Sequence, residues 1–138
     1  MAGSGRTPLF AVLHAASALE ARVEEQLAEV GLSLPKLAAL HQLSQAGDSL
    51  PLGQLAERLA CVKSNVTQLV DRLEADGLVV RAADPNDRRS RLAVITEGGK
   101  SAYERGMHIQ QRAEREIFGS LSREESTALH ELLEKIAR

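Results

Sequence analysis

The sequence predicts a mainly α-helical protein with one small β-hairpin, and three observations support this fold class. Hydrophobic residues make up 43% of the 138-residue chain, yet it has no Trp, two Phe and one Tyr, so aliphatic side chains must form the core, which favours packed helices. Apolar residues recur at helical spacing through most of the chain, and the period changes to two only between residues 78 and 95. This length suits one core, so we expect a single domain over residues 1–138.

The first two helices are predicted from their ends. Thr7 is suited to cap a helix that begins at Pro8, because proline fits the first helical position, and Gly31 ends that helix. Its apolar stripe consists of Val12, Ala16, Leu19, Val23, Leu27 and Val30. A second helix is expected after Ser33, up to a turn at residues 47–49.

Two shorter helices, separated by a tight turn at residues 60–62, follow in the middle of the chain. The first is expected within residues 52–59, with Ala56 where the two helices cross closely. The second turns Val66 and Leu69 inward. This spacing is typical of a helix-turn-helix.

A β-hairpin is predicted beyond Gly77. Residues 78–81 and 91–95 have the composition of short strands, and the Asp-Pro-Asn-Asp cluster at 84–87 between them favours a turn.

Two further helices complete the expected fold. Thr96 is suited to cap a long helix, and Ser122 with Glu125 forms a capping-box pattern at the start of the last one. The last helix carries Leu129, Leu132, Leu133 and Ile136.

Polar or basic side chains of modest size fill the outward face of the helix that follows the tight turn. They can hydrogen-bond base edges or phosphates without adding negative charge. We therefore expect DNA contacts from Lys63, Ser64, Asn65, Thr67, Gln68 and Arg72. The alternative is an ordinary solvated face of an amphipathic helix.

Three arginines lie at or beside the tip of the hairpin, namely Arg88, Arg89 and Arg91. A hairpin directly after a helix-turn-helix forms a wing, and the negative potential of a narrow minor groove attracts arginine. We expect these side chains to contact phosphates and the minor groove; the alternative is that they only keep an exposed hairpin soluble. Net charge is −2 overall, but residues 52–91 hold seven basic and six acidic side chains, so the middle of the chain is relatively basic.

Residues 55–99 resemble the MarR family of bacterial transcriptional regulators. The resemblance rests on the VDRLE-x-x-GLV segment and on the D-x-R pattern of Asp87, Arg88 and Arg89, and the stretch GLSLPKLAALHQL at 31–43 agrees with it. It implies a winged helix-turn-helix lobe at about 34–96, with dimerisation helices at 8–32 and 97–138. It also implies a homodimer on a palindromic operator that acts as a ligand-responsive repressor.

The resemblance also suggests roles for two acidic residues. Asp71 would pair with Arg89 or with neighbouring backbone groups and so position the wing, the alternative being an ordinary exposed acid. Asp87 would shape the hairpin beside Arg89.

Cysteine and histidine are sparse. Cys61 occupies the apolar position of the turn, so a structural role is favoured over redox sensing. His14 and His41 are candidates to line a ligand cleft between the dimerisation helices and the DNA-binding lobe, or else ordinary polar groups on helix faces. No paired ligand spacing is present, so we expect no metal and no cofactor.

Other function classes have weaker support. The chain lacks a glycine-rich phosphate loop and a nucleophile–base pairing, which argues against an enzyme. It has no apolar signal segment and no membrane-length run, so we expect a cytoplasmic protein that does not enter membranes. The alternative to a DNA-binding regulator is a winged-helix module that binds protein instead.

Overall fold

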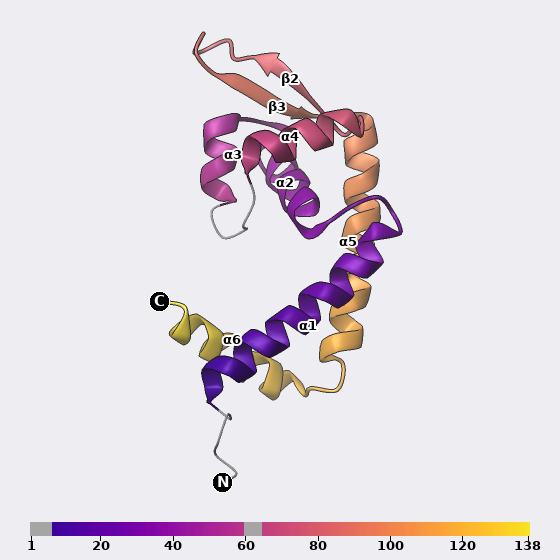
Figure 1. Ribbon diagram of the computed structural model, residues 1–138, viewed down its shortest axis with the longest axis vertical. Coiled ribbons are helices and arrows are strands. Elements are labelled where there is room, and N and C mark those ends of the chain that lie inside the picture. The colour runs from indigo at the N-terminus through magenta and orange to yellow at the C-terminus, as the bar shows by residue number, and fades with distance from the viewer. Residues whose placement is uncertain (1–6, 60–64) are drawn as a thin grey trace.

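The computed structural model describes residues 7–59 and 65–138 (Figure 1). Residues 60–64 lie outside this part of the chain. They include the expected tight turn at 60–62 with Cys61, and two of the expected DNA contacts, Lys63 and Ser64. The elements are α1 (Pro8–Ala28), α2 (Leu34–Gln45), β1 (Ser49–Pro51), α3 (Leu52–Arg58), α4 (Val66–Ala75), β2 (Val79–Ala83), β3 (Arg91–Ile95), α5 (Glu97–Phe118) and α6 (Arg123–Ile136). A mainly helical fold with a small hairpin is thereby confirmed.

Helices α2, α3 and α4 and the sheet form a lobe at one end of an elongated molecule. Figure 1 shows α2, α3, α4 and the strands gathered at that end, α6 at the other end, and the long helix α5 running between them. Helix α1 packs against α5. No helix in the described ranges is long and apolar enough to cross a membrane.

Side-chain caps begin three of the helices where the sequence predicts them. The Ser33 hydroxyl accepts a hydrogen bond from the Lys36 amide (3.3 Å), and Thr96 Oγ1 accepts one from the Gly99 amide (3.0 Å). Ser122 and Glu125 form the complete capping box. Thr7 occupies the N-cap of α1, with Pro8 at the first helical position, although its side chain makes no capping bond.

The sheet has one strand more than the sequence analysis anticipates. Strands β2 and β3 pair antiparallel as the predicted hairpin, with Val80 opposite Val94. Strand β1 pairs with the other edge of β3, with Leu50 opposite Ala93, and the order is β1-β3-β2. Because β1 has only three residues and begins at Ser49, the last residue of the predicted turn, no alternating pattern indicates it.

The core of the lobe lies where α2, α3 and α4 meet the sheet. Its fully buried side chains include Leu40, Leu43, Leu55, Leu73 and Val79.

The prediction that Ala56 lies at a close helix crossing is wrong. Ala56 is exposed, because the short helix α3 turns Leu55 inward instead, and Leu59 directly after the helix is also buried.

Helix α5 begins in close contact with the end of α4. Thr96 Oγ1 donates a hydrogen bond to the Gly77 carbonyl (2.7 Å), and the Thr96 amide donates to the Leu78 carbonyl (3.0 Å). A Cβ atom on Gly99 would lie 2.1 Å from the Leu78 carbonyl oxygen, so only glycine fits this approach of two backbones. The base of the wing and the start of α5 are therefore packed as one unit.

Candidate nucleic-acid interface

Helix α4 has the two faces that its sequence predicts. Leu69, Val70 and Leu73 are buried against the lobe, and Val66 is half-buried. The opposite side is exposed and carries Thr67, Gln68, Asp71 and Arg72, with Asn65 at its beginning. The structure thus brings together four of the residues proposed to contact DNA: Asn65, Thr67, Gln68 and Arg72.

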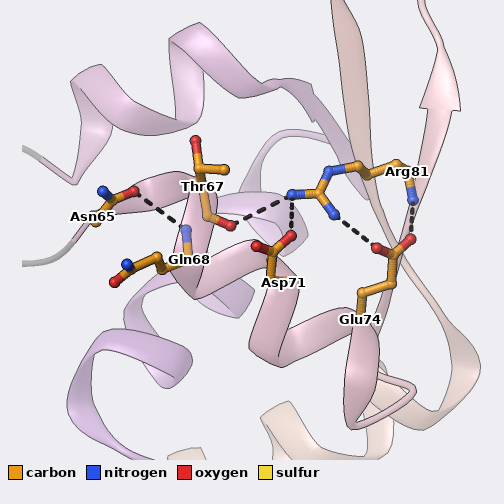
Figure 2. A network of polar contacts seen from close by, with 6 residues as sticks. All are labelled: Asn65, Thr67, Gln68, Asp71, Glu74 and Arg81. Atoms are coloured by element: carbon orange, nitrogen blue, oxygen red, sulfur yellow. Dashed lines mark hydrogen bonds and ion pairs between the residues drawn. The ribbon is translucent and has the colours of Figure 1, made fainter.

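Asn65 lies just before the helix and not within it. Its backbone is extended, and its side-chain oxygen accepts a hydrogen bond from the Gln68 amide at 3.2 Å (Figure 2). Within the described ranges, the side-chain nitrogen of Asn65 makes no hydrogen bond, and the residue is exposed. The sequence contains a signal for this cap, since Asn followed three residues later by Gln is a helix-start pattern.

Arg81 of β2 joins the wing to α4. Its Nη2 donates to Asp71 Oδ1 at 2.8 Å and its Nη1 to Glu74 Oε1 at 2.7 Å, while a longer bond of 3.4 Å reaches the Thr67 carbonyl (Figure 2). The Arg81 backbone amide also donates to Glu74 Oε2. One guanidinium, only 18% exposed, therefore pairs with two carboxylates on α4 and offsets the charge of one of them.

The two carboxylates raise the pKa of Arg81 above its ordinary value, chiefly through the hydrogen bond to Asp71. A guanidinium is effectively always protonated in proteins, so Arg81 is a permanent cation beside the two carboxylates.

The expected pairing of Asp71 with Arg89 is corrected by this geometry. Asp71 faces Arg81 because β2 runs beside α4, whereas Arg89 lies in the loop beyond the ends of both strands. Within the described ranges, Arg89 forms no ion pair. The pairing of Arg81 with α4 is not predicted from the sequence, although the place of Arg81 shortly after α4 is a usable signal.

Two short turns shape the tip of the wing. Asp84 Oδ1 accepts from the Asn86 amide and Asp87 Oδ1 from the Arg89 amide, each at 2.9 Å. Such bonds from an Asp side chain to the amide two residues later are typical turn chemistry. Asp87 therefore holds the backbone at Arg89.

The wing arginines are exposed. Arg88 and Arg89 lie in the loop after β2, and Arg91 begins β3, where its Nε donates a 3.4 Å bond to the Ala82 carbonyl. Figure 1 shows the hairpin projecting past α3 and α4. Exposed positive charge is thus present on both α4 and the wing.

The two candidate ligand-binding histidines are not in equivalent places. His41 lies on α2, half-buried, with Nδ1 2.7 Å from the Tyr103 hydroxyl. It lines a cavity of about 220 Å³ between α2 and α5, together with Leu34, Leu37, Ala38, Met107 and Gln110. His14 is exposed on α1 and does not line this cavity.

Comparisons with known proteins agree with this geometry. Residues 32–90 match the model of the MarR family. The HTH-type transcriptional regulator MhqR of Bacillus subtilis (strain 168) is 30% identical over 129 residues, which cover 93% of this chain and 88% of MhqR. The uncharacterized HTH-type transcriptional regulator YfiV of the same organism is 34% identical over 114 residues, which cover 80% of this chain and 68% of YfiV.

A solved structure extends the likeness to the whole fold. The transcriptional repressor CouR, bound to a 23-mer DNA duplex, superposes with a TM-score of 0.86 at 26% identity, covering 99% of this chain and 96% of CouR.

Proposed function

The chain belongs to the MarR family of transcriptional regulators, and from this premise we propose that it acts as a homodimeric, ligand-responsive repressor on a palindromic operator. The observation that carries the proposal is the exposed polar face of α4 beside a wing with exposed arginines. In a helix-turn-helix this face enters the major groove. The similarity to a repressor bound to duplex DNA supports the same use here. As a regulator of genes it would work in the cytoplasm.

Helix α4 and the wing would make different kinds of contact with DNA. Asn65, Thr67 and Gln68 carry donors or acceptors that can read base edges, whereas Arg88 and Arg89 on the wing suit phosphates and the minor groove. Lys63 and Ser64, which precede α4 in the sequence, would extend the first group, and Arg72 and Arg91 would contact phosphates.

The proposed homodimer is supported by apolar side chains that the single chain leaves in contact with water. These are Leu9, Phe10, Val12 and Leu13 on α1, and Leu132, Leu133 and Ile136 on α6. Helix α6 has no buried residue of its own, and an isolated helix of 14 residues is marginal in water. Full burial of one such side chain stabilises by about 1.5–3 kcal/mol, so pairing with a second copy would stabilise both ends.

The proposed effector site is the cavity between α2 and α5. Its lining is mostly apolar, and His41 supplies a polar edge where it meets Tyr103. A small aromatic ring with one polar group, such as a phenol, fits this chemistry. A phenol that weakens DNA binding by the wild type should have less effect on Ala38→Phe, whose added ring occupies the cavity, and an equal effect would remove the cavity from the mechanism.

Selection from genomic DNA tests the function. Sheared DNA from the source organism is incubated with the protein at low and moderate salt, and the retained fragments are sequenced. We expect enrichment of an inverted repeat whose half-site centres lie about ten base pairs apart or a multiple of that. The variant Gln68→Ala/Arg72→Ala, with native circular dichroism, should lose this enrichment. If no fragment is retained at either salt concentration, the chain would instead be a protein-interaction module.

A further inference from the structure

A hollow of about 320 Å³ lies beside the proposed reading face, between the start of α2 and the exposed side of α4. Ser33 and Lys36 line it from the α2 side, and Asn65, Gln68 and Arg72 line it from the α4 side. Among the described residues that line this hollow, none carries a carboxylate. It therefore offers two cations, a hydroxyl and two amides.

These side chains, and not the backbone at the start of α2, make the hollow suitable for an anion. The Leu34 amide already donates to Glu24 Oε1 at 2.6 Å, and the Lys36 amide donates to the Ser33 hydroxyl oxygen. Pro35 has no amide hydrogen. The Ser33 hydroxyl hydrogen and the cationic ends of Lys36 and Arg72 remain as donors.

Lys36 is held at the edge of the hollow by an acidic neighbour. Its Nζ lies 2.8 Å from Oδ2 of Asp76, the C-cap residue directly after α4, and its side chain is 20% exposed while that of Asp76 is 42% exposed. Such a partly exposed pair contributes little to folding stability. Asp76 therefore positions Lys36 but also offsets its charge.

We propose that this hollow receives a phosphate of the DNA backbone, and that Ser33 and Lys36 of α2 are further DNA contacts. This inference rests on the proposed function, because Gln68 and Arg72 belong both to the hollow and to the face assigned to the major groove. The strand that borders that groove would pass over the hollow. Phosphate contacts beside a reading helix fix its register on the duplex.

Two charge-changing variants give opposite results if the inference is correct. Lys36→Gln should weaken operator binding several-fold and make the slope of log affinity against log salt shallower by about one unit per subunit, thus about two per dimer. Asp76→Asn should tighten binding, because it frees Lys36 from its carboxylate. Lys135→Gln on α6, at the other end of the molecule in Figure 1, is the matched control and should leave both quantities unchanged.

A purely structural role for the pair predicts a different pattern. If Lys36 and Asp76 only brace α2 against α4, both variants would lower the melting temperature and weaken DNA binding together. That result would overturn the inference. Wild-type protein that retains no DNA would contradict the proposed function itself, whereas wild-type binding that Lys36→Gln leaves unaltered would contradict only this contact.

Ethylation interference locates the phosphate. Ethylation of one backbone phosphate in each half-site should block the wild type, and Lys36→Gln should be insensitive at that position; an unchanged pattern would overturn the inference.

Discussion

At the scale of single residues, the side-chain amide of Asn65 caps α4 and is also proposed to contact a base. Asn65 caps α4 through its oxygen, so that oxygen is partly committed to the Gln68 amide. The side-chain nitrogen has no hydrogen bond within the described ranges and is available for the proposed contact with DNA. Gln68 has no such commitment, since only its backbone amide takes part in the cap. The two neighbours should therefore respond differently to substitution.

Substitutions at Asn65 and Gln68 can distinguish capping of α4 from recognition of DNA bases. Asn65→Asp keeps a good cap and should retain stability, whereas Asn65→Ala should cost about 1 kcal/mol in free energy of unfolding. Both should lose operator preference, and so should Gln68→Ala, by about 1–3 kcal/mol on the cognate site with little change on random DNA. Urea denaturation and fluorescence anisotropy measure the two effects. Full operator affinity in Asn65→Asp would exclude base reading by this amide.

The clamp at Arg81 gives a second prediction. Arg81→Ala leaves Asp71 and Glu74 without their partner on the face proposed to meet DNA. DNA affinity should fall because two uncompensated carboxylates repel phosphates, and Arg81→Lys should restore only part of it because an ammonium lacks the planar fork. Adding Asp71→Asn to Arg81→Ala should recover some affinity. If it lowers affinity further, the repulsion argument fails.

The exposed wing residue Arg89 gives a third prediction. Because it forms no ion pair within the described ranges, Arg89→Ala should leave the melting temperature unchanged. It should weaken operator binding and make the salt slope shallower by about one unit per subunit. Anisotropy titrations at several salt concentrations test this. Unchanged affinity and slope would remove the proposed minor-groove role.

At the scale of elements, the joint between the wing and α5 depends on a glycine. Gly99→Ala would place a Cβ against the Leu78 carbonyl oxygen and 2.7 Å from Ile95 Cγ1, so backbone must shift. We expect a loss of about 1–3 kcal/mol or more in free energy of unfolding. Gly53→Ala in α3 is the control, because its Cβ would meet nothing within 4 Å, and it should stabilise by up to about 1 kcal/mol. Equal denaturation midpoints for the two variants would contradict this account.

Among the helices and strands, those whose ends depend on neighbouring residues could be predicted from the sequence. Helix starts and the hairpin depend on neighbouring residues, as in the Ser33 cap, the Ser122 capping box and the Asp-Pro-Asn-Asp turn, and these predictions are confirmed. Strand β1 is not indicated by local patterns because its partner β3 lies far along the chain. The Asp71–Arg81 pair joins residues that are near in sequence, but it depends on how β2 folds back beside α4, which is a tertiary property. Ala56 was misplaced for the same reason, since the crossing of two helices is a tertiary property.

At the scale of the whole molecule, the apolar ends of α1 and α6 predict assembly. Light scattering should find a dimer at micromolar concentration. Leu132→Asp/Ile136→Asp, both changed at exposed positions, should yield a folded monomer that binds one half-site weakly and loses the gain from two linked contacts. Lys135→Gln should remain dimeric. A wild-type monomer at that concentration would contradict the palindromic-operator proposal as well.

The continuity of α5 has a mechanical consequence. This helix of 22 residues starts two residues after β3 and is fastened there to the end of α4 through Thr96. Its length is about 33 Å at the rise of an α-helix. A lever of that length converts a tilt of about 10° at the end near α6 into a shift of about 6 Å at the wing. Such a shift exceeds the length of a hydrogen bond, so a modest change in the angle between two subunits would suffice to withdraw a wing from its groove.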